Sequence, residues 1–189
     1  MRTNSRLLVF TLILIAITTI CKYEFGPRLE WSGFSPMIAI SLFSGMLISD
    51  RTKSFFLPLI ALFASDVIIH GLYLADLFKY PGLYQWQIFN YALLLATTLI
   101  GWAIKGRNYG SIAAGAVIAP TVFFLVSNFG SWVIDYGNLY SNDMNGLMAS
   151  YEAGLPFYKR TLAATLIFLP SIMLCYNYIV KRTLTLKLA

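Results

Sequence analysis

The amino-acid sequence predicts an all-α polytopic membrane protein, a bundle of six transmembrane helices with both termini in the cytoplasm. Hydrophobic residues make up 58% of the 189 residues and charged residues only 12%, whereas about a quarter of a soluble domain is charged. The apolar residues are grouped in blocks, and a helix that crosses a bilayer needs about 20 of them. Residues 1–189 are therefore predicted to form one transmembrane domain with no additional soluble domain.

The first span is predicted over residues 7–23. Two arginines precede its apolar run, so the N-terminal segment resembles a secretory signal. A signal cleavage site needs small residues just before the cut, whereas Thr19 and Ile20 precede Cys21. We therefore expect a retained helix, with lipoprotein processing at Cys21 as the alternative.

Five further spans follow from the stretches that lie between charged residues. They cover residues 34–49, 55–73, 88–104, 111–129 and 161–180. The third span contains Asp66 and His70, so its hydropathy is the least typical of a transmembrane helix. Small residues recur every four positions in the second and fifth spans, as Ser41 and Gly45 do in the second. This spacing predicts that these two helices are buried against their neighbours.

A short additional helix is predicted over residues 144–157, between the fifth and sixth spans. Apolar side chains from Met144 to Leu155 recur there at helical spacing, which favours a helix lying on the membrane surface or capping the bundle. Gly154 and Pro156 are expected to end it.

The distribution of basic residues predicts the orientation in the bacterial cytoplasmic (inner) membrane. The two termini and the connections after the second and fourth spans hold nine Lys and Arg residues, and the other connections hold five. The basic excess belongs in the cytoplasm, so the connections 22–33, 71–87 and 130–160 are expected outside. The net charge of +6 is therefore interpreted as loop residues facing anionic lipid, and nucleic acid is not an expected partner.

Asp66 and His70 are the first candidate site residues, because a four-residue spacing places them on one face of the third span. An ionisable residue within a span normally faces the protein interior or a water-filled cavity. Asp66 could orient the ring of His70, which would then offer its other nitrogen to a ligand, a metal or a proton. Alternatively, Asp66 ties helices together and His70 is an interfacial residue.

Further polar and aromatic candidates gather at the predicted outer face. They are Asn90, Asn128, Trp132, Tyr151, Phe157, Trp31 and Ser35. Aromatic loops above a helix bundle can form an apolar pocket with a few directed polar groups. The same residues could instead anchor the protein at the membrane boundary, where aromatic side chains are common.

Enzymatic motifs are missing from the sequence. It holds one His and two distant Cys residues, with no metal-ligand cluster, no Gly-rich phosphate loop and no Ser/His/Asp arrangement. The sequence therefore predicts a protein that is not an enzyme and has no cofactor.

Four segments resemble an uncharacterised bacterial family of small membrane proteins. They are residues 34–45 (FSPMIAISLFSG), 65–66 (SD), 128–132 (NFGSW) and 151–157 (YEAGLPF). That family is similar to the S components, the substrate-binding subunits of energy-coupling-factor (ECF) vitamin transporters. The resemblance implies a six-helix S-component fold, a vitamin or related ligand bound from the outer face, and a transmembrane and ATPase module on separate chains.

A corrinoid such as cobalamin is the ligand favoured by this resemblance, with His70 or Cys21 as residues that could meet cobalt. One feature departs from the S-component pattern. The first span has Ala16 followed by Ile20, rather than the small residues that dock the shared transmembrane partner. The resemblance therefore leaves open whether the protein acts alone or with a different partner. Two other functions are also open, a proton-coupled transporter that uses Asp66 and His70, and a structural subunit of a membrane complex.

Overall fold

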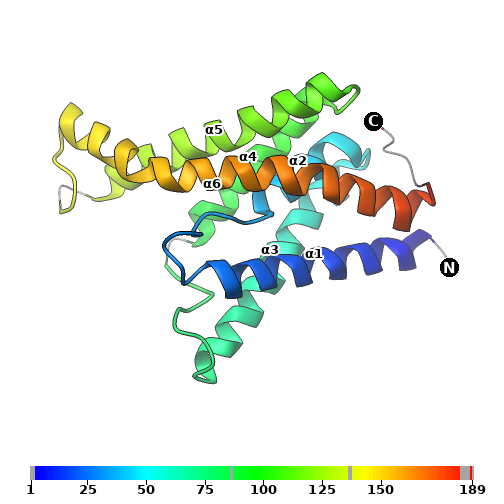
Figure 1. Ribbon diagram of the computed structural model, residues 1–189, viewed down its shortest axis with the longest axis horizontal. Coiled ribbons are helices and arrows are strands. Elements are labelled where there is room, and N and C mark those ends of the chain that lie inside the picture. The colour runs from blue at the N-terminus through cyan, green and yellow to red at the C-terminus, as the bar shows by residue number, and fades with distance from the viewer. Residues whose placement is uncertain (1–2, 86, 136–137, 184–187, 189) are drawn as a thin grey trace.

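The computed structural model describes residues 3–85, 87–135, 138–183 and 188. They form helices and connecting loops, with no strand in these ranges (Figure 1). The elements are α1 (Thr3–Phe25), α2 (Met37–Leu47), α3 (Arg51–Leu74), α4 (Gln87–Ile104), α5 (Tyr109–Asp135), α6 (Met144–Tyr176) and a π-helical turn, η1 (Asn177–Lys181). This confirms the predicted all-α fold, and each of the six predicted spans contains a helix.

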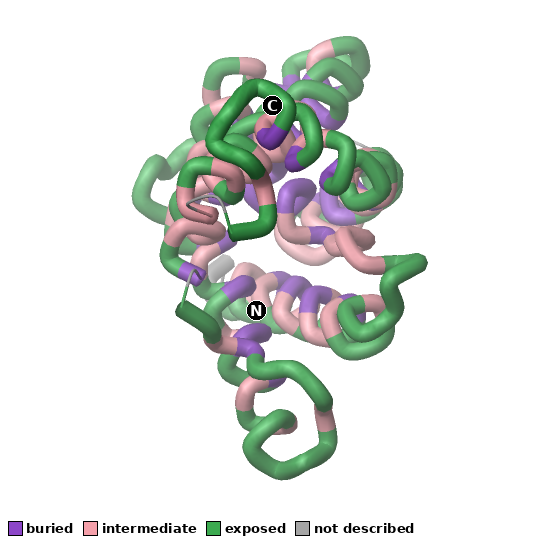
Figure 2. The backbone as a smooth tube through the Cα atoms, turned by 90° about the vertical axis from the view of Figure 1, so that its left-hand side faces the viewer, coloured by how far each residue is buried: buried purple, intermediate pink, exposed green. Residues whose placement is uncertain are grey.

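Five helical segments are long and apolar enough to cross a membrane, namely α1, α3, α4, α5 and the continuous segment of α6 and η1. Large apolar side chains are exposed on their outer sides, as Leu8, Leu12, Phe56, Ile60 and Phe63 illustrate. Figure 2 shows exposed residues along the outside of the helices and buried residues toward the interior. Such a surface suits lipid, so the protein is a multi-pass membrane protein.

Helix α2 is shorter than the predicted span over residues 34–49. It begins only after Pro36, because a proline disfavours the helical conformation in the residue before it, and it ends where Ile48 becomes extended. Eleven residues cover about 16 Å at 1.5 Å each, which is too short to cross a bilayer alone. However, α2 lies in the middle of the bundle against α3, α4, α5 and α6, and all residues from Ile38 to Leu47 are buried.

Two glycines bring α2 and α4 into direct backbone contact. A Cβ atom on Gly45 would lie 2.1 Å from the carbonyl oxygen of Thr98, and one on Gly101 would lie 2.5 Å from the carbonyl oxygen of Leu42. The small-residue spacing of the second span thus marks a close helix crossing, and the prediction that this helix is buried is confirmed.

The prediction that the fifth span is buried is correct for only part of α5. Its buried residues all fall between Ile112 and Pro120. Beyond them α5 continues to Asp135, past residue 129, where the predicted span ends. Gly130 therefore lies within a helix, where its lack of a side chain accommodates Phe89, whose Cζ would lie 2.5 Å from an added Cβ.

The predicted surface helix over residues 144–157 is not a separate element. It forms the first part of α6, which continues through Gly154 and Pro156. In this stretch α6 packs closely against α5, since a Cβ on Gly154 would lie 2.3 Å from Oδ1 of Asn128.

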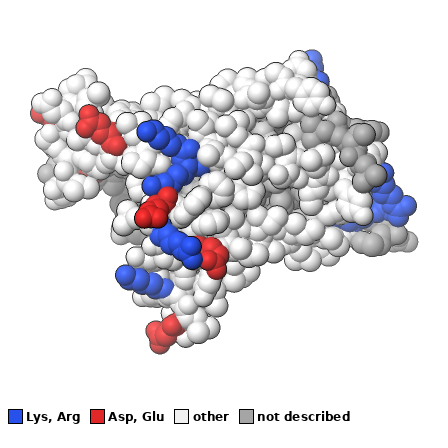
Figure 3. Space-filling model, viewed as in Figure 1, with Lys and Arg blue, Asp and Glu red and all other residues white. Residues whose placement is uncertain are grey.

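Both described ends of the chain lie at the same end of the bundle (Figure 1), as the prediction of both termini on one side requires. On the face shown in Figure 3, this end carries Lys and Arg without Asp or Glu, whereas the opposite end carries both signs of charge. The loop before α2 and the loop between α3 and α4 lie at the opposite end. That end holds the candidate site.

Candidate functional site

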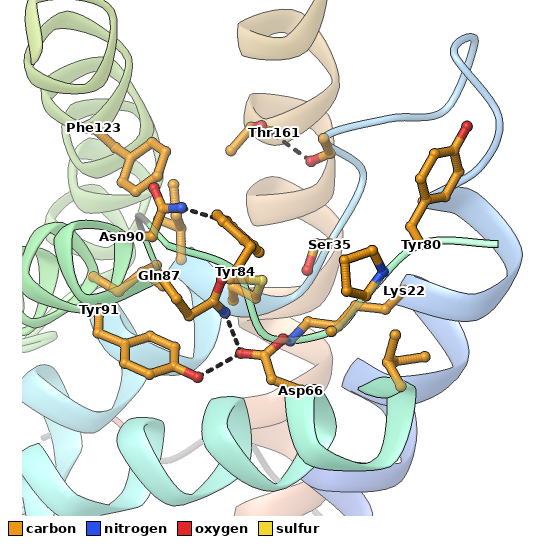
Figure 4. A pocket seen from close by; sticks show the side chains of 18 of the residues that line it. Lys22, Ser35, Asp66, Tyr80, Tyr84, Gln87, Asn90, Tyr91, Phe123 and Thr161 are labelled. Atoms are coloured by element: carbon orange, nitrogen blue, oxygen red, sulfur yellow. Dashed lines mark hydrogen bonds and ion pairs between the residues drawn. The ribbon is translucent and has the colours of Figure 1, made fainter. Parts of the chain in front are cut away.

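A cavity of about 380 Å³ lies beneath the loops that precede α2 and α4. Its walls come from both loops and from all six helices, with Met37 and Ile38 contributed by α2 (Figure 4). The polar residues on which the site depends are Lys22, Ser35, Asp66, Tyr84, Gln87, Asn90 and Tyr91. Apolar side chains, including Ile69, Leu94 and Phe123, complete the lining.

Asp66, on α3, is the centre of the polar network. Its Oδ1 accepts a hydrogen bond from Nζ of Lys22 on α1. Its Oδ2 accepts from Nε2 of Gln87 at 2.5 Å and from the hydroxyl of Tyr91 at 2.7 Å, both on α4. Figure 4 shows these side chains converging on the carboxylate. Asp66 thus joins three helices.

Lys22 and Asp66 form an ion pair inside the bundle, with side chains only 17% and 5% exposed. Nζ of Lys22 also donates to Oγ of Ser65 at 2.7 Å. A lone charge in a bilayer is costly, and a buried pair is tolerated when further hydrogen bonds satisfy its members. The donors around Asp66 meet this condition, so the cavity has a polar floor whose charges cancel.

The loop before α4 closes over α3 through Gly82. A Cβ atom at this position would lie 2.1 Å from the carbonyl oxygen of Asp66 and 2.6 Å from the backbone nitrogen of His70. Only a residue without a side chain allows so close an approach. The loop thereby places Tyr84 at the cavity.

Tyr84 and Asn90 form a second polar pair at the cavity wall. Nδ2 of Asn90 donates to the hydroxyl oxygen of Tyr84 at 2.5 Å. Burial raises the pKa of the Tyr84 phenol, so this hydroxyl keeps its proton. Because it accepts from Asn90, its own proton is free to be donated to a ligand.

The loop before α2 is fixed to α6 on the other side of the cavity. Gly33 has a φ of +93°, and a Cβ there would lie 3.0 Å from the carbonyl oxygen of Phe157. The carbonyl oxygen of Gly33 accepts from Oγ1 of Thr161 at 3.0 Å. This attachment positions Ser35 in the cavity wall (Figure 4).

Two buried polar atoms of the lining have no hydrogen-bond partner among the described residues. They are Oγ of Ser35 and Oε1 of Gln87. Buried polar atoms are nearly always satisfied in folded proteins, so an orphaned one calls for an explanation such as water or a ligand. Together with the Tyr84 hydroxyl, they supply directed groups for a polar molecule.

Three of the residues predicted from the sequence line this cavity, namely Asp66, Ser35 and Asn90. Asn128 and Phe157 line a smaller cavity of about 190 Å³ between α5 and α6. The two cavities share Phe123 and Thr161 as wall residues. Nδ2 of Asn128 donates to the carbonyl oxygen of Phe124 at 2.8 Å, so this amide is already engaged within its own helix.

His70 does not form the predicted pair with Asp66. Its ring lies beside that of Tyr73, with centroids 5.9 Å apart, and its buried Nδ1 has no partner among the described residues. The spacing of four residues places both side chains on one helix face, but Lys22 and two residues of α4 occupy the carboxylate. His70 is also not among the lining residues of the cavity.

Trp132, Tyr151 and Trp31 also lie outside the two cavities. Nε1 of Trp132 donates to the carbonyl oxygen of Ser141 at 3.0 Å, and the hydroxyl of Tyr151 donates to the carbonyl oxygen of Leu125 at 3.1 Å. Trp31 packs against the rings of Phe25 and Phe34. These side chains hold the loops and α6 in place.

Four residues of the site are not predicted from the sequence, namely Lys22, Gln87, Tyr91 and Tyr84. Lys22 lies where the predicted first span (residues 7–23) meets the predicted outer connection (22–33), so the sequence does not mark it as a residue of the helix interior. Gln87 and Tyr91 are spaced by four residues on α4, which places both on the face toward Asp66. That spacing is the signal in the sequence by which Gln87 and Tyr91 could have been found.

No cluster of three or more His, Cys, Asp or Glu side chains suited to a metal ion occurs in the part of the chain that the structure describes. Cys21 and Cys175 are both free. Cys21 is buried and is absent from the cavity lining.

A family model described as "Family of unknown function (DUF6580)" matches residues 1–186. Neither a curated protein nor a solved structure matches the chain.

Proposed function

The chain belongs to the DUF6580 family, and we propose that it is a membrane subunit that binds a vitamin or related micronutrient for uptake. The ligand enters at the end of the bundle opposite the termini. The membrane is the bacterial cytoplasmic membrane, with the termini in the cytoplasm. The excess of Lys and Arg at the end with the termini supports this orientation.

The observation that carries this proposal is the Lys22–Asp66 ion pair at the floor of the cavity. Ionisable residues within a membrane are costly and commonly mark a substrate or ion pathway. A pair that served only to join helices would need no open space beside it. Here it borders about 380 Å³, with the unpartnered oxygens of Ser35 and Gln87 in the same lining.

The lining favours a small ligand whose polar part has no net charge. Lys22 and Asp66 cancel each other, whereas Gln87 offers an acceptor and Tyr84 and Ser35 offer donors. Ligand pockets generally measure about 300–1,000 Å³, so a cavity of about 380 Å³ lies at the small end of that range. A ring system with amide or hydroxyl groups fits these donors, acceptors and apolar walls.

A corrinoid has less support than a smaller vitamin. The cavity is small for a macrocycle of that size, and neither His70 nor Cys21 lines it. The site therefore does not support the expectation, drawn from the family resemblance, that one of these residues binds cobalt. Cobalamin stays a prediction to be tested beside smaller ligands.

An S-component-like mode of action agrees with several features. They are the helix count, the termini at one end and a cavity beneath the loops of the other end. In that mode the energy comes from a transmembrane and ATPase module on separate chains. Ala16 and Ile20, the departure from the docking pattern on α1, are both exposed and remain accessible to a partner.

A proton-coupled transporter is the second candidate, because the cavity contains a titratable pair. The relay would run through Asp66 and Lys22 rather than through His70, which does not contact the carboxylate. In this case Asp66→Asn abolishes the dependence of uptake on a pH gradient and leaves ligand affinity largely intact. A structural subunit without a ligand is the third candidate.

Native mass spectrometry of gently extracted protein tests the proposal. We expect a bound small molecule, and we expect Ser35→Ala to lose most of it, because Ser35 lines the cavity and its Oγ has no partner among the described residues. Ser171→Ala is the matched control, since Ser171 is exposed on α6 and bonds only within its own helix. A protein that carries a stoichiometric partner and no small molecule would instead support the structural subunit.

A further inference from the structure

A second hollow, of about 470 Å³, lies at the end of the bundle that carries the termini. It is formed by the end of α2, the start of α3 and the connection between α4 and α5. Three basic residues, Arg51, Lys105 and Arg107, line it together with Trp102. The remaining lining includes the apolar side chains of Met46 and Ile48.

The three basic side chains lack an acidic partner. No ion pair is formed by Arg51, Lys105 or Arg107 with any carboxylate of the described residues. Asp50 is the nearest acid in the sequence, but it pairs with Nζ of Lys53 at 3.3 Å and caps α3 by accepting from the backbone N–H of Lys53. The hollow therefore has an uncompensated positive charge.

Trp102 gives the hollow a rigid wall. Its Nε1 donates to Oγ of Ser54 at 3.0 Å, and the ring of Phe55 packs edge-on against it with centroids 4.6 Å apart. The guanidinium of Arg51 lies over the ring, 5.5 Å from its centroid. This contact holds the Arg51 charge beside the hollow while leaving its N–H groups available.

We propose that this hollow binds a phosphate group, supplied by the headgroup of an anionic phospholipid. Arg and Lys are the residues that hold phosphate in proteins. Basic pockets between transmembrane helices at the cytoplasmic side are suited to anionic headgroups. Met46 and Ile48 add apolar contact for the part of the lipid next to the phosphate, which free phosphate would not use. The site is separate from the ligand cavity and does not depend on its function.

Lipid binding can be measured with the full chain in nanodiscs of phosphatidylcholine containing a minority of phosphatidylglycerol. Native mass spectrometry after release from the nanodiscs reports which lipid stays bound. We expect retained phosphatidylglycerol. The triple variant Arg51→Gln, Lys105→Gln, Arg107→Gln should bind it roughly a hundredfold more weakly, given the usual contribution of each basic residue near a membrane surface.

The matched control removes three other charges from the same end, through Arg6→Gln, Lys181→Gln and Arg182→Gln, and keeps Lys53 paired with Asp50. These residues do not line the hollow, so this variant should retain phosphatidylglycerol as the unaltered protein does. If both variants lose the lipid equally, the binding reflects overall charge and the proposal is overturned. Lys105→Gln alone, at an exposed loop residue, should weaken binding severalfold even if the triple variant does not fold.

Inorganic phosphate distinguishes the two sources of the phosphate group. It is titrated against protein in pure phosphatidylcholine nanodiscs, with the phosphatidylglycerol experiment as the reference. We expect no saturable phosphate binding at millimolar concentration. Saturable binding that displaces phosphatidylglycerol would show that the hollow takes soluble phosphate, and it would overturn the assignment to lipid.

Discussion

Lys22 and Asp66 lie 44 positions apart in the sequence and form an ion pair that joins α1 to α3 inside the bundle. The pair belongs at once to the fold, because it connects helices, and to the cavity, because both residues line it. Removing one member of the pair should therefore affect stability differently from removing both.

Asp66→Asn should lower the free energy of unfolding by about 3–5 kcal/mol, because it leaves the ammonium of Lys22 buried without its counter-ion. The double variant Lys22→Met, Asp66→Asn should recover a large part of this loss, since no unpaired charge then remains. Thermal unfolding of the purified proteins in detergent measures both. Equal destabilisation of the single and double variants would show that the ion pair is not the cause.

Gly82→Ala should displace the loop before α4, because the added Cβ would lie 2.1 Å from the carbonyl oxygen of Asp66. Steric strain of this kind costs about 1–3 kcal/mol, and the displaced loop should also weaken ligand retention. Gly71→Ala, on α3, is the control, since no atom lies within 4 Å of its added Cβ. The melting temperature should fall for Gly82→Ala and stay level or rise slightly for Gly71→Ala.

Gly45→Ala should loosen the crossing of α2 and α4, where the new Cβ would lie 2.1 Å from the carbonyl oxygen of Thr98. We expect a destabilisation of about 1–3 kcal/mol, as for other overpacked positions. Gly110→Ala serves for comparison, because its nearest neighbour is Oδ1 of Asn108 at 3.4 Å. Thermal unfolding that is equal for the two variants would argue against a close helix crossing.

Asp143 should make the start of α6 sensitive to acid. The hydroxyl of Ser141 and the backbone N–H of Gly146 donate to its carboxylate, and they lower its pKa in the folded state. The stabilisation is therefore complete above the pKa of the unfolded chain, near 3.9, and is lost as the pH falls through the lower folded value.

The comparison of unaltered protein with Asp143→Ala isolates this effect. The difference in melting temperature between the two should be constant near neutral pH and should shrink as the solution is acidified below about pH 4. Asp143→Asn keeps a good helix cap without the charge, so its stability should lack this pH dependence. A difference that grows on acidification would contradict the assignment.

Most of the fold could be predicted from the sequence, because apolar blocks between charged residues mark membrane helices whatever their partners. The exceptions depend on packing. Pro36 shortens α2, which tolerates this only because other helices surround it. Gly154 and Pro156 predicted a helix end, yet α6 continues through both, and Gly154 packs closely against Asn128 of α5.

The candidate site was less predictable, because its residues come from distant parts of the chain. Asp66 could be identified as a charge within an apolar span, but its partners depend on which helices meet it. The four-residue spacing predicted His70 as the partner of Asp66, whereas Lys22 on α1 is the actual partner. Local periodicity shows the face on which a side chain lies and does not show what lies opposite.

Accessibility of Tyr84 from the outer side of the membrane is the most direct measurement of whether the cavity faces outward, because Tyr84 lines the cavity and is 50% exposed. Tyr84→Cys is placed in a chain that carries Cys21→Ala and Cys175→Ala, and intact spheroplasts are treated with a small, membrane-impermeant methanethiosulfonate. Ser49→Cys, at the end with the termini, is the matched control. We predict modification of Tyr84→Cys in intact spheroplasts, and modification of Ser49→Cys only after the membrane is opened. The reverse pattern would place the cavity toward the cytoplasm and contradict capture of a ligand from outside.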